Sequence, residues 1–256
     1  MAAIRSVAQA GIPIAYSSQV KDIVVDYEDA ESLRNALVGV DAVVSTLGAP
    51  TVGNLQCALV DAAAASGVQR FIPSNFGCGQ ENSLTRTLPV FAEKVKIEDY
   101  LVEKAQATSL SYTFIYNNLF LDWNGGDLPI SVARLSTVVK GIVGVLKNPT
   151  ATKNRSIKIE DGKTLFKDLA STLQDAIPGS WIIKEGETDG LHPKSDEALK
   201  KVILDGWVWL NCILQGATNA KYGGSFQHVD NDLVGLPTLS EDEIKVLAKD
   251  IAQEHI

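Results

Sequence analysis

The chain has 256 residues, a formal net charge of -8 and a hydrophobic content of 45%. These values allow a large buried core, in one α/β body or in two lobes. The acidic balance argues against a nucleic-acid partner, because phosphate binding needs clustered Lys and Arg. The sequence lacks an apolar run of about 20 residues and a charged leader, so we expect a cytoplasmic protein without a membrane partner.

The three cysteines, Cys57, Cys78 and Cys212, are odd in number and far apart. This spacing predicts buried free thiols rather than disulfides or a zinc site. A reactive thiol at Cys78 is the alternative interpretation. The histidines have no other ligand-type residue at metal-binding spacing, so no metal site is predicted.

The opening stretch "MAAIRSVAQAGIPIAYSS" has the pattern of the end of a helix followed by a strand. Gly11 is a typical residue for the end of a helix, and Ile12 to Tyr16 form a short apolar run. The apolar face of the predicted helix consists of Ala2, Ile4, Val7 and Ala8.

Apolar runs and helical patterns alternate from Val20 to Phe120. Asn54 is predicted to cap the second helix, and Gly67 to end it. The alternation predicts a doubly wound parallel sheet, in which ligands bind at the carboxyl ends of the strands. The predicted strands are 20–27, 41–50, 69–77 and 112–120, and the predicted helices are 28–40, 53–67 and 90–105.

The second half of the chain is less regular. It contains two predicted helices, 136–148 and 164–177, and one predicted strand, 155–161, before a long stretch with Trp181, Trp207 and Trp209. We expect a nucleotide-binding part at 1–123 and a substrate-binding part at 124–256, packed as one body.

Lys94 lies within the apolar stripe of the predicted helix 90–105. Two interpretations remain: the side chain reaches the helix edge, or it points into a cleft, where burial makes it usable as an acid or base. Glu98 lies four residues further on, and we predict that it pairs with Lys94 and sets its charge state.

Tyr100 and Lys104 have the Tyr-x-x-x-Lys spacing of many short-chain reductases. Tyr100 projects from the flank of the helix, away from Lys94, so a half-buried core tyrosine is the favoured interpretation. A second alignment places Lys94 at the lysine position and Val90 at the tyrosine position.

Five segments follow a familiar order and spacing: "DAVVSTLG", "GVQRFIPSNFG", "FAEKVKI", "YTFIYNNLFLDW" and "LKNPTATKNRSIKI". They resemble the NmrA-like and isoflavone-reductase-like family, especially its fungal members. The resemblance implies a Rossmann-like core that binds NADPH, a smaller C-terminal part that closes over the substrate, and Lys94 as the catalytic acid or base. The implied cofactor-binding residues are Ser45, Thr46, Leu47, Gly48, Ser74, Asn75, Phe76, Gly77, Lys94 and Asn117.

The sequence departs from the family pattern at two gaps, one before Ala2 and one after "LFLDW", where the family has a longer segment before "GGDLPIS", and also at a basic position. The family's opening strand and glycine-rich turn do not precede Ala2, so we expect the sheet to be truncated at its N-terminus. Ser17 and Ser18 stand where the family has a basic residue for the 2′-phosphate. We therefore expect weak NADPH binding, with a dissociation constant of about 0.1 mM or higher.

The leading functional hypothesis is an NADPH-dependent reductase of a small aromatic or carbonyl-bearing metabolite, with a proton relayed by Lys94. A non-catalytic dinucleotide sensor that binds a regulatory protein is the first alternative. A shortened, inactive reductase product is the second. The sequence predicts no oligomeric state.

Overall fold

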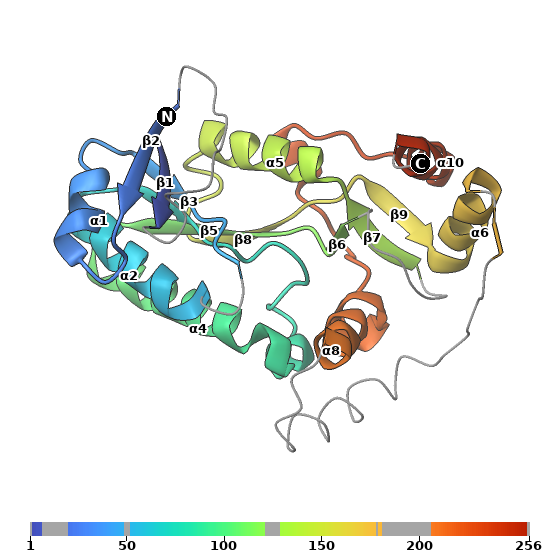
Figure 1. Cartoon of the computed structure of the whole chain (residues 1–256), viewed down its shortest axis with the longest axis horizontal. Coiled ribbons are helices and arrows are strands. Elements are labelled where there is room, and N and C mark those ends of the chain that lie inside the picture. Colours follow the sequence, from blue (N-terminus) through green and yellow to red (C-terminus); the bar gives the residue numbers. More distant parts are fainter. Residues whose placement is uncertain are drawn as a thin grey trace. The chain divides into compact units, whose positions relative to one another are not determined.

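Strands and helices alternate along the first half of the chain, as the sequence predicts (Figure 1). The computed structural model describes residues 2–6, 20–48, 52–120, 129–177, 179–180 and 206–254. Contacts divide the chain into a first unit, Met1–Ser74 with Lys96–Thr113, and a second unit, Asn75–Val95 with Phe114–Ile256. The predicted division into a nucleotide-binding part, 1–123, and a substrate-binding part, 124–256, concerns function rather than contacts. It stays a prediction.

Parallel strands of the first unit belong to two separate sheets, one of two strands and one of four. Within the four-stranded sheet, Ala42 pairs with Arg70, and Arg70 pairs in turn with Ser111. Parallel strands need a crossover between them, and the predicted helices provide it. The elements are β2 (Lys21–Val25), α1 (Ala30–Ala36), β3 (Ala42–Val44), α2 (Val52–Ala65), β4 (Arg70–Ile72), α4 (Ala92–Ala107) and β5 (Ser111–Tyr116), of which α4 and β5 continue into the second unit.

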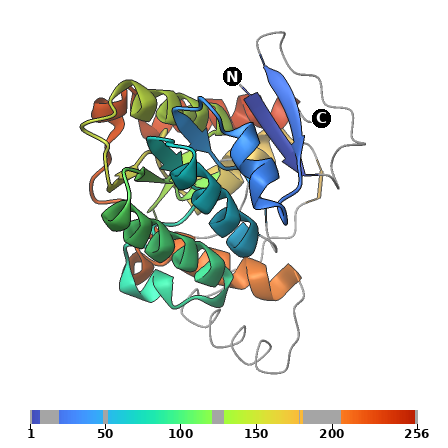
Figure 2. The same cartoon turned by 90° about the vertical axis from the view of Figure 1, so that its left-hand side faces the viewer.

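The helix predicted at Ala2 and Ile4 is wrong, because β1 (Ala2–Ser6) is a strand. It pairs in parallel with β2, with Ile4 opposite Ile23, and Figure 2 shows the two strands side by side with α1 beside them. An unpaired edge of β2 offers backbone donors and acceptors, and a second strand satisfies them. The rest of the predicted helix and strand, 7–19, lies outside the described residues.

Of the two predictions for the ends of α2, one is confirmed and one is wrong. Gly67 ends the helix as predicted: it has a φ of +77°, and the N–H of Val68 donates to the Ala63 carbonyl at 3.0 Å. The predicted capping role of Asn54 is wrong, because α2 already begins at Val52. The Asn54 side chain instead accepts a hydrogen bond from Lys96 Nζ of α4 at 3.0 Å.

A separate three-stranded sheet lies in the second unit. Its β6 (Leu119–Phe120) pairs in parallel with β7 (Pro129–Ala133), which pairs in antiparallel with β9 (Gly162–Leu165). The sequence did not predict β7 or β9, since both are short and lack strong alternation. The other elements are α3 (Ser83–Arg86), η2 (Pro89–Phe91), α5 (Leu135–Lys147), β8 (Arg155–Lys158), α6 (Phe166–Ala176), α8 (Gly206–Thr218), η4 (Ala220–Tyr222), α9 (Asn231–Val234) and α10 (Glu241–Glu254).

A hydrophobic core in the second unit takes buried residues from η2, β6, β7, α6, α8 and α10. Helices α6 and α10 lie side by side against β9 (Figure 1). Burial of their apolar faces is the main favourable term for this part of the fold. Within the described ranges, no helix is long and apolar enough to cross a membrane. The buried core residues are Cys78, Leu88, Phe91, Leu119, Ile130, Val132, Leu169, Ala217, Ile244 and Ala248.

Two glycines let α5 approach its neighbours closely. A Cβ atom added at Gly144 would overlap the carbonyl oxygen and Cβ of Val234 in α9. A Cβ atom added at Gly141 would lie 2.7 Å from Cδ1 of Ile159, which is the end of a flexible side chain. The backbone of α9 cannot yield as easily as that side chain.

We predict that Gly144→Ala lowers the free energy of unfolding by about 1–3 kcal/mol, although Ala has the higher helix propensity. Gly141→Ala serves as the control and is expected to cost less than about 1 kcal/mol, because Ile159 can change rotamer. Urea denaturation of both variants measures the difference. Equal losses for the two variants would contradict the close packing of α5 on α9.

Candidate active site

The loops that follow β3 and β4 begin next to each other in the first unit. The N–H of Ser45 donates to the Ile72 carbonyl at 2.8 Å, which continues the pairing of the two strands. The N–H of Ser74 donates to Oε1 of Gln56, a fully buried residue of α2, at 2.8 Å. Among the described residues, Gln56 Nε2 has no hydrogen-bond partner. The carboxyl ends of β3 and β4 therefore present polar groups side by side.

The remaining predicted residues of this edge differ in exposure. Ser45 is buried and its hydroxyl accepts a 3.5 Å contact from the N–H of Leu47. Thr46 and Gly48 are exposed. A Cβ atom added at Gly48 would meet no atom within 4 Å, so open space adjoins this backbone. A ligand can therefore approach the backbone of this loop closely.

In the second unit, the loop after β4 holds both ends of Lys94. The ammonium Nζ donates to the Phe76 carbonyl at 2.6 Å, and Asn75 Nδ2 donates to the Lys94 carbonyl at 3.3 Å. Lys94 is half-buried and Asn75 fully buried. A hydrogen bond from a charged donor contributes about 1.5–3 kcal/mol, so this contact fixes the ammonium to the loop.

Gly77 connects this loop to the end of β5. Its φ of +129° is strained for any residue with a side chain. A Cβ atom there would lie 3.6 Å from Lys94 Nζ. The Gly77 carbonyl accepts hydrogen bonds from the N–H groups of Asn117 and Asn118, at 3.2 and 2.9 Å. The structure thus joins the predicted residues Asn75, Phe76, Gly77, Lys94 and Asn117 within one unit.

Within the described part of the chain, the Asn117 side chain is buried without the hydrogen bonds that a buried amide normally makes. It is 0% exposed, and neither its Oδ1 nor its Nδ2 has a hydrogen-bond partner among the described residues. A buried amide without partners costs about 1–3 kcal/mol, so such a group is found where a ligand or water completes it.

The Cys78 thiol is not a reactive group. Burial raises its pKa to about 12, although the nearby Lys94 charge opposes the shift. Cys78 is 3% exposed and packs in the core. The prediction of buried free thiols is confirmed for Cys78 and Cys212, whereas Cys57 is half-buried.

Helix α4 has the predicted faces. Ile97, Glu98 and Leu101 are buried, and Asp99 and Glu103 are exposed. Burial raises the pKa of the Tyr112 phenol, and the Glu98 charge adds to this shift. The pairing of Glu98 with Lys94 stays a prediction.

Tyr100 and Lys104 are engaged with α2 in the first unit. The Tyr100 hydroxyl donates to Asp61 Oδ1 at 2.6 Å, and Lys104 Nζ contacts the same oxygen at 2.6 Å. Lys104 Nζ also lies 5.1 Å from the centre of the Tyr100 ring. This contact between two helices agrees with the favoured structural interpretation of the pair.

Trp209 is 37% exposed on α8, while Trp181, Ser17 and Ser18 lie outside the described residues. The described ranges hold no group of three side chains suited to a metal ion.

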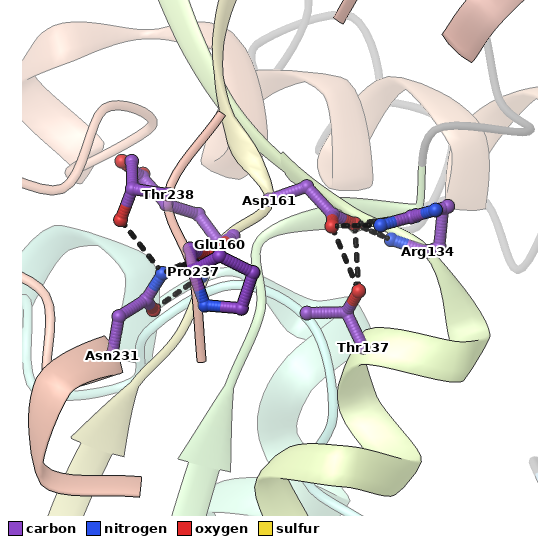
Figure 3. A network of polar contacts seen from close by, with 7 residues as sticks. All are labelled: Arg134, Thr137, Glu160, Asp161, Asn231, Pro237 and Thr238. Atoms are coloured by element: carbon purple, nitrogen blue, oxygen red, sulfur yellow. Dashed lines mark hydrogen bonds and ion pairs between the residues drawn. The ribbon is translucent and has the colours of Figure 1, made fainter. Parts of the chain in front are cut away.

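Two further carboxylates, Glu160 and Asp161, are buried after β8. Asp161 accepts hydrogen bonds from the Arg134 N–H and Nη2 at 2.6 Å each, and from the Thr137 hydroxyl at 2.8 Å (Figure 3). Its oxygens therefore hold the N-terminus of α5, where an anion is stabilising. Asn231 lies beside Glu160 and binds its backbone N–H and carbonyl, at 3.2 and 2.8 Å.

The sequence of the first half matches a known protein family. Residues 2–124 match the model of the NmrA-like family. This part of the chain is therefore similar to that family. Over 264 residues the chain is 26% identical to the oxidoreductase poxI of Penicillium oxalicum, covering 92% of this chain and 80% of the relative. Over 214 residues it is 28% identical to phenylcoumaran benzylic ether reductase Pyrc5 of Pyrus communis, covering 76% and 67%.

The fold agrees with that of solved reductases. The complex of leucoanthocyanidin reductase with NADPH from Vitis vinifera superposes with a TM-score of 0.72 at 15% identity, over 98% of this chain and 90% of that one. At this identity the likeness concerns the fold alone. It confirms the predicted Rossmann-like α/β class of the chain.

We predict that Glu160→Gln makes the stability less dependent on pH. Burial raises the pKa of Glu160, while the Ser131 hydroxyl and the Lys163 charge oppose this shift. The neutral carboxyl is thus favoured, and its contribution is present at acid pH and lost as pH rises through the raised pKa.

Melting temperatures of both proteins, measured from about pH 5 to about pH 8, test this prediction. The difference between Glu160→Gln and the wild type should shift in favour of the variant as pH rises. A constant difference would contradict it.

Proposed function

We propose that the chain is an NADPH-dependent oxidoreductase that reduces a small aromatic or carbonyl-bearing metabolite, with Lys94 as proton donor. The observation that carries the proposal is the half-buried Lys94, whose ammonium is fixed 2.6 Å from the Phe76 carbonyl. The names of the relatives, which are an oxidoreductase and a phenylcoumaran benzylic ether reductase, support the same class of reaction.

Several features of the described residues fit a nicotinamide cofactor. The Asn117 amide is buried with neither polar atom paired among the described residues. Gly48 has open space beside its backbone. Loops at the carboxyl ends of parallel strands are the usual place for dinucleotides. We assign cofactor contacts to Ser45, Thr46, Leu47, Gly48, Ser74, Asn75, Phe76, Gly77, Lys94 and Asn117, and NADPH supplies a hydride when bound.

Lys94 supplies the proton that reduction of a carbonyl requires at oxygen. An ammonium has three N–H groups, and one of them is directed at the Phe76 carbonyl. This contact restricts the rotation of a long side chain and thereby orients the other two. After the transfer, the neutral amine regains a proton from water.

Cys78 does not compete for this role. The Lys94 charge lowers the pKa of the Cys78 thiol, but burial outweighs this effect and raises that pKa to about 12. A thiol of such weak acidity is a poor proton donor near neutral pH. Lys94 is therefore the acid in the proposed reaction.

We predict that Lys94→Met lowers kcat by about 100-fold or more, because the variant keeps the length of the side chain and loses the proton. Lys96→Met is the matched control: Lys96 lies on the same helix, is exposed and contacts Asn54 in the first unit. Its kcat should stay within about twofold of the wild type.

The assay follows the absorbance of reduced nicotinamide with a panel of aromatic aldehydes and ketones. Equal kcat for Lys94→Met and the wild type would contradict the role of Lys94. A wild-type chain that binds NADPH, reduces none of the panel and retains a regulatory protein in a pull-down would instead favour the dinucleotide sensor.

A further inference from the structure

We infer that Asn118 is a positioning residue that fixes the Gly77 loop and, through it, the ammonium of Lys94. The inference rests on the proposed function, since it concerns the proposed proton donor. The sequence places Asn117 and Asn118 at the end of a predicted strand, and only Asn117 is predicted to contact the cofactor.

The backbone of Asn118 is held in a conformation that few residues accept. Its φ is +52°, in the left-handed region where Asn is among the best tolerated residues after Gly. In this conformation its N–H donates to the Gly77 carbonyl at 2.9 Å. The residue type thus matches the backbone geometry that the contact with Gly77 requires.

The side chain of Asn118 is surrounded by three carbonyl groups. Its Nδ2 lies 3.0 Å from the Ser131 oxygen in β7, 3.0 Å from the Ala217 oxygen in α8, and 2.8 Å from the Gly224 oxygen. The residue is 2% exposed. Carbonyl oxygens are acceptors only, so the NH2 of Asn118 with its two N–H donors, and not its oxygen, faces them, which fixes the orientation of the side chain.

The contacts of Asn118 affect Lys94 through two successive peptide groups, which carry the Gly77 and Phe76 carbonyls. Gly77 can adopt many backbone conformations, and the two N–H groups bound to its carbonyl select one of them. The preceding carbonyl, that of Phe76, then points at Lys94 Nζ. A loop released from Asn118 would therefore move the acceptor that orients the ammonium.

Two substitutions separate the parts of this arrangement. Asn118→Asp keeps the size of the side chain and its tolerance of positive φ, but directs a carboxylate oxygen at three carbonyl oxygens. Asn118→Gly keeps the backbone N–H and the positive φ, and removes only the side-chain contacts. The glycine variant is the milder one and serves if the aspartate variant does not fold.

Asn231 provides a matched control in the same unit. It is also 2% exposed, and its Nδ2 donates to the Glu160 carbonyl at 2.8 Å, the Pro237 carbonyl at 3.1 Å and the Thr238 hydroxyl at 2.9 Å (Figure 3). No described hydrogen bond joins Asn231 to Gly77. Asn231→Asp therefore disturbs a similar buried amide away from the loop.

The first measurement is the rate at which an amine-acylating reagent modifies Lys94 relative to Lys96 in the full chain without ligand, followed by mass spectrometry. We expect this ratio to rise about fivefold in Asn118→Asp and Asn118→Gly, because the ammonium is less firmly held. We expect it to stay unchanged in Asn231→Asp.

An unchanged ratio in folded Asn118→Gly, or an equal rise in Asn231→Asp, would overturn the positioning role. The second measurement is steady-state kinetics, in which kcat should fall in the Asn118 variants with little change in KM. Because acylation needs no substrate, a wild-type chain without reductase activity would contradict the proposed function and leave the acylation result to decide the role of Asn118.

Discussion

The hydrogen bond between Lys94 Nζ and the Phe76 carbonyl is the contact on which this account depends. A lysine side chain carries about 2 kcal/mol of rotamer entropy, so an unrestrained ammonium would seldom point in one direction. The hydrogen bond restricts the Lys94 side chain. Its acceptor is a backbone carbonyl, which carries no titratable proton. The loop that carries this carbonyl is in turn held by Gly77 and by the two asparagines after β5.

The fold brings these residues together because parallel strands end at the same edge of a sheet. β4 and β5 are paired in parallel, so the loop after β4 and the residues after β5 are neighbours although about 40 positions separate them in the sequence. Helix α4 returns the chain between these strands and carries Lys94 in its first turn. The site thus follows from the topology of two strands and one helix rather than from a local motif.

Much of this arrangement is visible in the sequence, and the rest depends on tertiary contacts. The apolar periodicity of α4 predicts its buried face and the unusual position of Lys94, and Gly67 ends α2 where the sequence indicates. The strand β1 could not be predicted, because a few apolar residues fit a helix or a strand equally well. The role of Asn118 depends on three carbonyl groups from residues 131, 217 and 224. No local sequence pattern indicates that these groups lie close together. The only local signal was an Asn, which tolerates positive φ.

The most direct test of the central claim observes the Lys94 ammonium itself while NADPH is added. In a chain with isotope-labelled lysine, the Lys94 side-chain resonance can be assigned by its loss in Lys94→Met. The account predicts that this resonance shifts in a saturable way with NADPH, while the exposed lysines of α5, Lys140 and Lys147, change little. A Lys94 resonance that stays in place when NADPH saturates the chain would contradict the account.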